Sequence, residues 1–347
     1  MLAAFARATG GPDPLANLVV GEQPVPEPQP GWATVRVRAA SLNHHDLWTL
    51  RGVSSRPVVP PQILGCDAAG TVAAYVGSAP PGAPEVGARV VVHSPVTCGQ
   101  CAACRGGDEM SCRRPAMLSE PPLPGTFAEY VAVPADNLIP LPVGVDFSVA
   151  ACLPTAYLTA YHGLFQRARL QPGMTVLVHG AGGGLPSAAI LLGVRAGLTV
   201  YATSRDESKR QFALDLGATA AYPPERETAR EVITATGGMG VDAVIETVGE
   251  PTWELSLRAV RPGGTVVVSG ATGGINPPAQ LNRIFFRNVT VAGSTMGTRG
   301  ELRRLIDLCA RGALNPVIGS RHALADATSA FAEMEHGEVR GKIVLES

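Results

Sequence analysis

The sequence is poor in lysine, in aromatic residues and in long apolar runs. Only two of its 28 basic residues are lysines, Lys209 and Lys342, and we interpret this skew as codon composition rather than as an arginine-rich binding surface. Acidic residues number 29, so the formal net charge is −1, and aromatic residues make up 5% of the chain. Because neither an overall positive field nor a basic stripe with interleaved aromatics is present, we expect no nucleic-acid partner.

Segments that would place the protein in a membrane are also missing. No apolar run approaches the about 18 residues of a spanning helix, so we expect no membrane association. Residues 2–6 are too short for the apolar core of a signal peptide and lack a basic lead-in, which predicts a cytoplasmic protein. The 347 residues are enough for two domains, each with its own core.

The stretch around which the chain is organised is TVLVHGAGGGLPSAAILLGVRA, residues 175–196. Four residues of β-type sequence run into a glycine cluster, and a helical pattern follows. The cluster comprises Gly180, Gly182, Gly183 and Gly184. A strand, a glycine turn and a helix N-terminus together suit a bound pyrophosphate. The match to G-x-G-x-x-G is incomplete because Leu185 takes the place of the third glycine, and a tight turn in some other parallel sheet is the alternative.

The end of the next expected strand, 198–202, bears on the choice of cofactor. The residues that follow it are Thr203, Ser204 and Arg205. An NAD-preferring site places an acid here to accept from the ribose hydroxyls, whereas Asp206 and Glu207 come later, in the first turn of the next helix. Arg205, with Lys209 one turn on, suits a 2′-phosphate and therefore predicts NADPH. A solvated Arg205 without a ligand is the alternative.

Cysteines are concentrated in one segment. Four of the seven follow the spacing C-x2-C-x2-C-x7-C, and they are Cys98, Cys101, Cys104 and Cys112. Without a secretion signal, such a cluster predicts a metal site rather than disulfides. Four thiolates leave no open position, so we predict one structural zinc, with unliganded or redox cysteines as the alternative. Cys152 and Cys309 are interpreted as small buried apolar residues.

The order of patterns along the chain predicts an α/β protein with two parts. Residues 1–140 favour a β-rich domain with strands at 33–39, 70–76, 89–92 and 126–133. Residues 149–166 read as a long helical stretch interrupted near Pro154. Strands then alternate with helices, and these strands are expected at 175–178, 198–202, 218–222, 241–245, 265–269 and 289–292. Helices at 206–216, 301–311 and 326–336 and a strand at 342–345 complete the expectation.

Together these features resemble the medium-chain dehydrogenase/reductase superfamily over the whole chain, with the greatest similarity to its zinc-type alcohol dehydrogenase-like and quinone oxidoreductase-like branches. The motifs are SLNHHDLW (41–48), ILGCDAAGTV (63–72), the cysteine lobe (98–112), LPTAYLTAY (153–161), VLVHGAGGG (176–184), GGTVVVSGATGG (263–274), VAGSTMGT (291–298) and GKIVL (341–345). The resemblance implies a GroES-like catalytic domain formed by 1–155 and 299–347, with the structural-zinc lobe at 93–125. It implies a Rossmann dinucleotide-binding domain at 156–298.

The resemblance also implies further cofactor contacts and an assembly. Beyond the glycine turn and the strand end after 202, the implied contacts are His44, Val248, Gly270, Ala271, Thr272, Thr295 and Met296. In the family the last Rossmann strand pairs across a two-fold axis. Residues 288–292 (NVTVA) form such an otherwise open edge, so we expect a homodimer.

The departures from the family concern its catalytic zinc. Zinc-dependent members carry Cys-x-(Thr/Ser)-Asp where residues 43–46 read Asn-His-His-Asp, and Gly-His-Glu where residues 65–67 read Gly-Cys-Asp. Their third ligand, a cysteine, falls near Thr155. Since no usual ligand is kept, we predict no catalytic zinc. A rebuilt metal site is the alternative, and its ligands would be Cys66, Asp67 and His45.

Without a Lewis acid, a hydride acceptor must be activated by hydrogen bonds, which suits an activated alkene, a quinone or a carbonyl. Asn43 is the expected donor to the substrate oxygen or the nicotinamide ribose. His45 is expected to protonate the developing enolate, with Tyr157 as a second donor, although each can equally be structural. Asp46 is expected to bond neighbouring backbone. The predicted function is an NADPH-dependent reductase of a small molecule. The alternatives are a zinc-dependent alcohol dehydrogenase and a non-enzymatic member of the fold.

Overall fold

The computed structural model describes residues 1–54 and 56–347, which form two compact units. Unit 1 comprises Met1–Leu158 and Met296–Ser347, and unit 2 comprises Thr159–Thr295. These limits lie within three residues of the domain limits expected from the sequence. Among the described residues, no helix combines the length and the apolar character needed to cross a membrane.

Unit 1 is built mainly of antiparallel strands. They are β1 (Leu2–Ala6), β2 (Leu18–Glu22), β3 (Trp32–Ser41), β4 (Gln62–Ile63), β5 (Asp67–Tyr75), β6 (Arg89–Val92), β7 (Pro95–Val96), β8 (Ala116–Met117), β9 (Tyr130–Pro134), β10 (Leu138–Pro140), β17 (Ile318–Ala323) and β18 (Lys342–Glu346). Seven of them form the main sheet in the order β10-β6-β5-β3-β18-β17, with β9 also pairing with β3. A second sheet has the order β2-β1-β4, and β7 pairs with β8.

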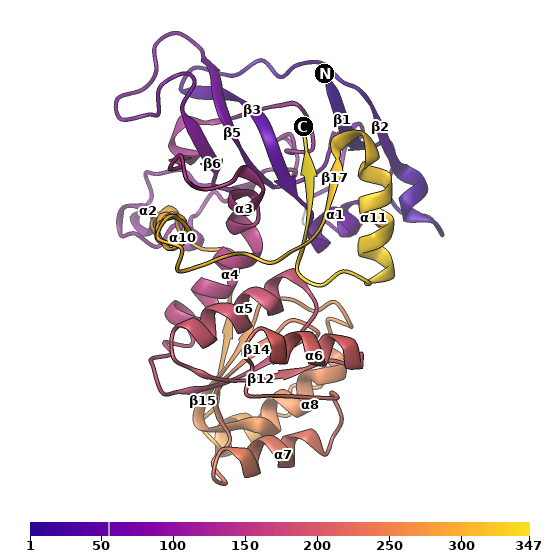
Figure 1. Ribbon diagram of the computed structural model, residues 1–347, viewed down its shortest axis with the longest axis vertical. Helices are drawn as coiled ribbons and strands as arrows, with labels where there is room; N and C mark the ends of the chain where they lie inside the picture. Colours follow the sequence, from indigo (N-terminus) through magenta and orange to yellow (C-terminus); the bar gives the residue numbers. More distant parts are fainter. Residues whose placement is uncertain (55) are drawn as a thin grey trace. The chain divides into compact units, whose positions relative to one another are not determined.

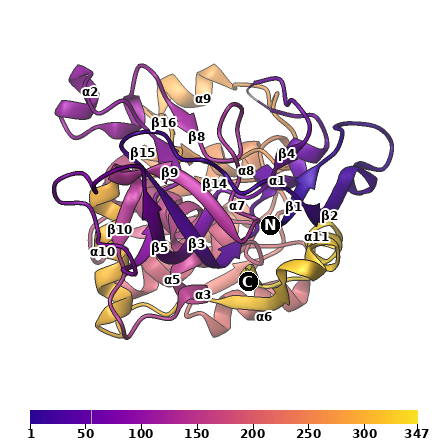
Figure 2. The same cartoon turned by 90° about the horizontal axis from the view of Figure 1, so that it is seen from above.

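The two ends of the chain meet on strand β3. Its partner β18 belongs to the last segment, and Val344 lies opposite Ser41. Both Figure 1 and Figure 2 place the C-terminus next to β3. On the other side, β5 pairs with β3 in the antiparallel direction, and a Cβ on Gly70 would lie 2.1 Å from the carbonyl oxygen of Arg36. The end of β3 and the starts of β5 and β18 are therefore brought together, and these three points carry the site described below.

Short helices complete unit 1. They are α1 (His44–Leu50), α2 (Ala102–Arg105), α3 (Phe147–Ala151), α10 (Arg299–Ala310), α11 (Ala327–His336), and the 3-10 turns η1 (Pro14–Asn17), η2 (Glu109–Ser111), η3 (Ala135–Asn137) and η6 (Leu324–Asp326). The core beneath them includes Phe127 and Phe331, whose rings meet edge to face at 6.0 Å. Gly65 is required beside Phe127, because its φ is +88° and a Cβ there would lie 2.3 Å from the ring.

One expectation in unit 1 needs correction. The strand expected at 126–133 begins only at Tyr130, because the N–H groups of Thr126 and Phe127 bond instead to the carbonyls of Gly65 and Leu64. The helical stretch expected at 149–166 is interrupted near Pro154, as the sequence predicts. After α3 it continues as η4 (Leu153–Tyr157), α4 (Leu158–Tyr161) and η5 (His162–Arg167), of which η4 and η5 are π-helical. Pro154 lacks an N–H and cannot continue the α-helical ladder.

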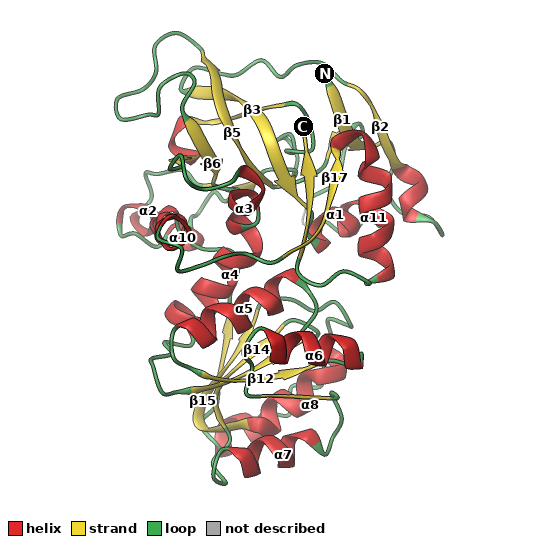
Figure 3. Ribbon diagram, in the orientation of Figure 1, coloured by secondary structure: helices red, strands yellow, loops and turns green. Residues whose placement is uncertain are grey.

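Unit 2 is a doubly wound sheet of six parallel strands, as the sequence predicts. The order is β13-β12-β11-β14-β15-β16. The strands are β11 (Thr175–His179), β12 (Thr199–Thr203), β13 (Ala220–Tyr222), β14 (Val241–Glu246), β15 (Val260–Val268) and β16 (Thr290–Gly293). Helices on both faces of the sheet (Figure 3) are α5 (Gly184–Arg195), α6 (Glu207–Asp215), α7 (Thr228–Ala235), α8 (Glu250–Ala259) and α9 (Leu281–Phe286). The winding reverses between β11 and β14, and such a point is where ligands bind at the carboxyl ends of the strands.

Candidate functional site

A buried carboxylate, Asp67, organises the polar centre of unit 1. Asp67 is the first residue of β5 and is fully buried. Its Oδ2 accepts hydrogen bonds from Ser41 Oγ at 2.9 Å and Asn43 Nδ2 at 2.8 Å. Its Oδ1 accepts from Thr155 Oγ1 at 2.6 Å and from Ser94 Oγ at 3.3 Å. Because an ion removed from water is unstable without donors, these bonds account for a carboxylate at this position.

Lys342 supplies the opposite charge. It is the first residue of β18 and 2% exposed, and its Nζ lies 3.6 Å from Asp67 Oδ2. The same ammonium donates to the backbone oxygen of Leu42 and to Asn43 Oδ1, both at 2.6 Å. Lys342 is a site residue that was missed from the sequence. A lysine in an apolar strand of a chain with only one other lysine was the signal available.

Asn43 therefore has partners at both ends of its amide. Its oxygen accepts from Lys342, and its nitrogen donates to Asp67 and, at 3.3 Å, to the Ser41 carbonyl. These bonds give Asn43 a structural role in holding the buried charge pair. Its predicted role as a donor to substrate or ribose stays a prediction, which would require one of these bonds to be exchanged.

Cys66 lies beside the same centre. Its Sγ is 3.5 Å from Thr155 Oγ1 and 3.6 Å from Asn43 Nδ2, and the residue is fully buried. Burial, together with the negative charges of Asp67 and Asp46, raises the pKa of the Cys66 thiol well above its usual value. The thiol therefore keeps its proton at neutral pH and is a neutral neighbour of Asp67.

Asp46 has the backbone role that the sequence predicts. Its Oδ2 accepts from the N–H of Asn43 at 2.8 Å, at the start of α1. Its Oδ1 accepts from the N–H of Gly65 at 3.1 Å. Asp46 thus joins the first turn of α1 to the segment that precedes β5, and it fixes the direction in which α1 leaves β3.

His45 lies between two carboxylates and is 19% exposed. Its Nε2 is 3.4 Å from Glu120 Oε1, and its Nδ1 is 3.9 Å from Asp46 Oδ1. Burial by itself disfavours the charged ring, but Asp46 and Glu120 outweigh it and raise the pKa of His45 to about 9. At neutral pH the ring is an imidazolium that has a proton to give. Glu120 was missed because nothing in its local sequence links it to a residue 75 positions earlier.

Tyr157, the other predicted proton donor, lies in the core of unit 1 and is fully buried. Its hydroxyl oxygen accepts a hydrogen bond from the backbone N–H of Val317 at 2.8 Å. Burial raises the pKa of Tyr157 above its usual value. The structure does not bring Tyr157 into the hydrogen bonds around Asp67. The contact with Val317 is structural, and the predicted role of Tyr157 as a second proton donor stays a prediction.

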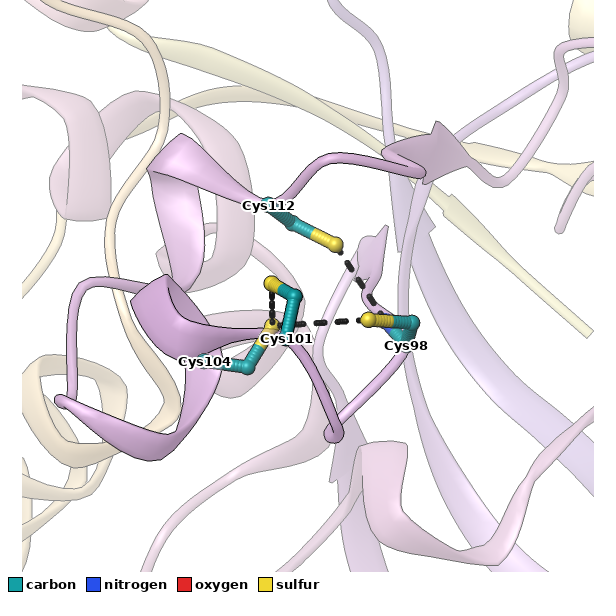
Figure 4. A group of neighbouring side chains, drawn as sticks. All are labelled: Cys98, Cys101, Cys104 and Cys112. Carbon is teal, nitrogen blue, oxygen red and sulfur yellow. Dashed lines mark hydrogen bonds between the residues drawn. The ribbon is translucent and has the colours of Figure 1, made fainter.

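The four clustered cysteines converge as a metal site requires. Cys98, Cys101, Cys104 and Cys112 offer Sγ atoms that all lie within 4.8 Å of one another (Figure 4). The Sγ atom of Cys104 is 3.5 Å from that of Cys101 and 4.0 Å from that of Cys98. A zinc ion with Zn–S bonds of about 2.3 Å needs sulfur atoms about 3.8 Å apart. Among residues 1–54 and 56–347, no other group of three or more His, Cys, Asp or Glu side chains meets this criterion.

The glycine turn of unit 2 is shaped for close approach of a ligand. Gly180 has a φ of +82°, and α5 begins at Gly184 with Gly183 as its N-cap, so that Leu185 is already helical. A Cβ on Gly182 would lie 2.4 Å from Cδ of Lys209, whose side chain therefore extends from α6 across the turn. A glycine turn, a 12-residue helix and a lysine over the turn fit a dinucleotide pyrophosphate.

The strand end after β12 presents cations and no carboxylate. Thr203 and Ser204 are buried and Arg205 is exposed. Asp206 is the N-cap of α6, and its Oδ1 accepts from the N–H groups of Ser208 and Lys209, as its expected place in the first turn implies.

A second arginine at this strand end was missed. Nη1 of Arg210 donates to the backbone oxygens of Ser204 at 2.9 Å and Arg205 at 3.0 Å. Its position one helical turn after Asp206 was the available signal.

The remaining predicted cofactor residues divide between the units. Val248 follows β14, and Gly270, Ala271 and Thr272 follow β15. They lie at the carboxyl edge that also carries the glycine turn, and the Thr272 N–H bonds to the Thr247 oxygen. Thr295 is exposed at the end of unit 2. His44 and Met296 belong to unit 1, where His44 is exposed on α1 and Met296 is buried with a φ of +50°.

Comparisons with known proteins match both units. Residues 29–143 match the family described as the alcohol dehydrogenase GroES-like domain, and residues 184–311 match the zinc-binding dehydrogenase family. Alcohol dehydrogenase 1 of Emericella nidulans is 32% identical, covering 99% of this chain and 97% of its own. A crotonyl-CoA carboxylase/reductase of Cereibacter sphaeroides is 30% identical, covering 94% of this chain and 82% of its own.

A crystal structure of an NAD-dependent alcohol dehydrogenase superposes with a TM-score of 0.92 at 34% identity, over 100% of both chains. Its likeness extends over the β-rich unit and the six-stranded parallel sheet alike, as the sequence resemblance implied. The chain therefore belongs to the medium-chain dehydrogenase/reductase superfamily of oxidoreductases.

Proposed function

We propose that this oxidoreductase uses NADPH to reduce an activated alkene, a quinone or a carbonyl of a small molecule, without a catalytic zinc. The observation that carries the proposal is the state of Asp67. Both of its oxygens are engaged by hydroxyl and amide donors, and an ammonium lies 3.6 Å away. To bind zinc, this carboxylate would have to give up donors inside the protein, which is unfavourable by about 1–3 kcal/mol for each group left unpaired.

A nicotinamide supplies the hydride when bound, and residues of this protein supply the proton. Reduction of an enone or a quinone places negative charge on an oxygen, which a positioned acid can neutralise. His45 is charged at neutral pH and remains partly accessible between Asp46 and Glu120. We assign the proton transfer to the partly exposed His45 rather than to Tyr157, which is fully buried in the core of unit 1.

Two alternatives remain open to test. The first is a zinc-dependent alcohol dehydrogenase with a rebuilt site. Several relatives are named alcohol dehydrogenase and one matching family is described as zinc-binding dehydrogenase, whereas the crotonyl-CoA relative is named for an α,β-unsaturated thioester. The second alternative is a non-enzymatic member of the fold. NADPH-dependent turnover of an enone or quinone supports the proposal. Oxidation of simple alcohols that chelators abolish favours the zinc enzyme, and cofactor binding without any turnover favours the non-enzymatic protein.

The choice of NADPH rests on the residues after β12, since one similar structure is of an NAD-dependent enzyme. We predict that kcat/KM for NADPH exceeds that for NADH at least about tenfold, because a charge-assisted bond to phosphate contributes on the order of 1.5–3 kcal/mol. Arg205→Ala should remove most of this gap, mainly through KM. Arg195→Ala, at the far end of α5, is the matched control. Equal use of NADH by the unchanged protein would contradict the assignment.

The charge on His45 predicts a basic limb in the pH profile. A pKa raised to about 9 means that the imidazolium persists at neutral pH and is lost as the pH rises through that value. We therefore expect kcat/KM to fall above about pH 9, and Glu120→Gln to move this limb to lower pH. His45→Gln should lower the rate by roughly 10²–10⁴-fold and remove the limb. The exposed Glu85→Gln serves as control, and an unchanged limb in His45→Gln would refute the role.

Metal analysis tests the structural zinc. We expect about one zinc per chain, because the four thiols converge as one tetrahedral set. Cys101→Ser should lose the metal and lower Tm, whereas Cys309→Ser, outside the cluster, should keep it. Two equivalents by mass spectrometry, with the second lost in Cys66→Ala, would instead support the rebuilt catalytic site.

We also propose a homodimer formed through unit 2. β16 is an edge strand, and the same unit exposes apolar side chains that include Phe286 at 79% and Ile275 at 77%. We expect light scattering to report a dimer at micromolar concentration and Phe286→Asp to weaken it. Val143→Asp, at an exposed apolar site of unit 1, should leave it intact. A stable monomer of the unchanged protein would overturn this proposal.

A further inference from the structure

Three neighbouring strands of unit 2 end in residues that share one chain of hydrogen bonds. β12 ends in Thr203, β11 in His179 and β14 in Glu246. His179 Nδ1 lies 2.7 Å from Thr203 Oγ1, and its Nε2 lies 3.0 Å from the hydroxyl of Ser256 in α8. Ser256 Oγ donates to Glu246 Oε2 at 2.5 Å. None of these four residues is more than 1% exposed.

The Glu246 carboxylate has a full set of donors. Besides Ser256 on Oε2, its Oε1 accepts from the N–H groups of Val248 at 2.9 Å and Gly249 at 3.0 Å and from Thr252 Oγ1 at 2.8 Å. Burial favours the neutral acid, but the hydrogen bonds from Ser256, Gly249 and Thr252 hold the pKa of Glu246 below its usual value. The group is therefore a buried anion at the N-terminus of α8, where the helix dipole also favours negative charge.

The charge on Glu246 determines where each proton lies in this series of hydrogen bonds. An ionised carboxylate can only accept, so the Ser256 hydroxyl donates its proton to Glu246. The Ser256 oxygen must then accept from Nε2 of His179. Burial holds the pKa of His179 below its usual value, against the opposing charge of Glu246, so the ring is neutral. With its proton on Nε2, its Nδ1 must accept from the hydroxyl of Thr203.

The series of hydrogen bonds ends at the backbone of the glycine turn. The backbone oxygen of Thr203 accepts from the N–H groups of both Gly180 and Ala181, each at 3.0 Å. On the other side, the Thr247 hydroxyl donates to the backbone oxygen of His179 at 3.0 Å. The backbone that would face a pyrophosphate is thus bonded to members of the buried relay, by which we mean the hydrogen-bonded side chains of Thr203, His179, Ser256 and Glu246.

We propose that Glu246 and His179 are positioning residues for dinucleotide binding, acting through Thr203 on the peptide groups of Gly180 and Ala181. Both side chains are fully buried, so they act on the backbone of the site rather than on the ligand. The inference rests on the proposed use of a nicotinamide dinucleotide, but it concerns affinity for NADPH and NADH alike. It is independent of substrate and of the 2′-phosphate.

The test compares binding with stability. Glu246→Gln puts an amide group among four donors, and Thr203→Val removes one hydroxyl while keeping the shape of the side chain. The dissociation constants for NADPH and NADH are measured by fluorescence titration of the zinc-loaded chain, alongside Tm. We expect both variants to raise both dissociation constants at least tenfold. Should Glu246→Gln fail to fold, Thr203→Val and Ser256→Ala carry the test.

A matched control lies on the same strand. Asp242 of β14 is also a paired carboxylate, accepting from the Thr175 N–H and hydroxyl at 2.8 Å and from Arg261 Nε at 2.7 Å. We expect Asp242→Asn to lower Tm and leave both dissociation constants within twofold. Unchanged affinity in Thr203→Val, or an equal loss in Asp242→Asn, would overturn the proposal.

A second readout requires no ligand. Nitrogen NMR of the His179 ring, assigned with His179→Gln, should show a neutral imidazole protonated on Nε2 at neutral pH. A ring protonated on Nδ1, or on both nitrogens, would contradict the relay. Failure of the cofactor choice appears differently, because Arg205→Ala would then leave the ratio of the two dissociation constants unchanged while Thr203→Val still raised both. Binding of neither dinucleotide by the unchanged protein would refute both proposals.

Discussion

A carboxylate that leaves water must be given hydrogen-bond donors, and each unit of this protein is arranged around one such group. In unit 1 the group is Asp67, whose partners come from β3, from η4 and, through Lys342, from the last strand of the chain. In unit 2 it is Glu246, which accepts from the backbone at the start of α8 and lies beside His179 at the end of β11. Removing one partner of a buried ion is unfavourable by about 3–5 kcal/mol, which is enough to hold these segments together.

Asp67 and His45 differ in how far burial encloses them. Asp67 is fully buried and all of its described contacts are to groups of the protein, which gives it a structural role. His45 is partly exposed, with Nε2 3.4 Å from Glu120 Oε1 and Nδ1 3.9 Å from Asp46 Oδ1. Its ring is the more accessible of the two groups, so the proposed function gives the proton transfer to His45 and leaves Asp67 and Lys342 a structural role.

Sequence reasoning succeeded where the information is local. The strand, the glycine turn and the start of α5 follow from periodicity within some 20 residues, and the cysteine spacing indicates its own cluster. It could not show where a side chain meets a distant partner. Asn43 bonds to Lys342, 299 positions later, and Tyr157 bonds to Val317, 160 positions later. The sequence shows that a polar group is present but not which protein group bonds to it, so these contacts were not foreseen, and the donor roles of both residues toward a ligand stay predictions.

The end of β12 shows how one short segment can serve both shape and charge. The Thr203 side chain is bonded to His179, and the Thr203 backbone oxygen accepts from the N–H groups of the glycine turn. In the residues that follow, Arg210 donates to the backbone oxygens of Ser204 and Arg205. Its guanidinium thereby stabilises the backbone conformation that leaves the Arg205 side chain exposed. The nearest acid, Asp206, is committed to the N-terminus of α6 and cannot accept from a ribose without uncapping that helix. The backbone at this strand end is therefore joined through Thr203, His179 and Ser256 to the buried carboxylate of β14, while the charge of the exposed Arg205 side chain is a separate feature of the same segment.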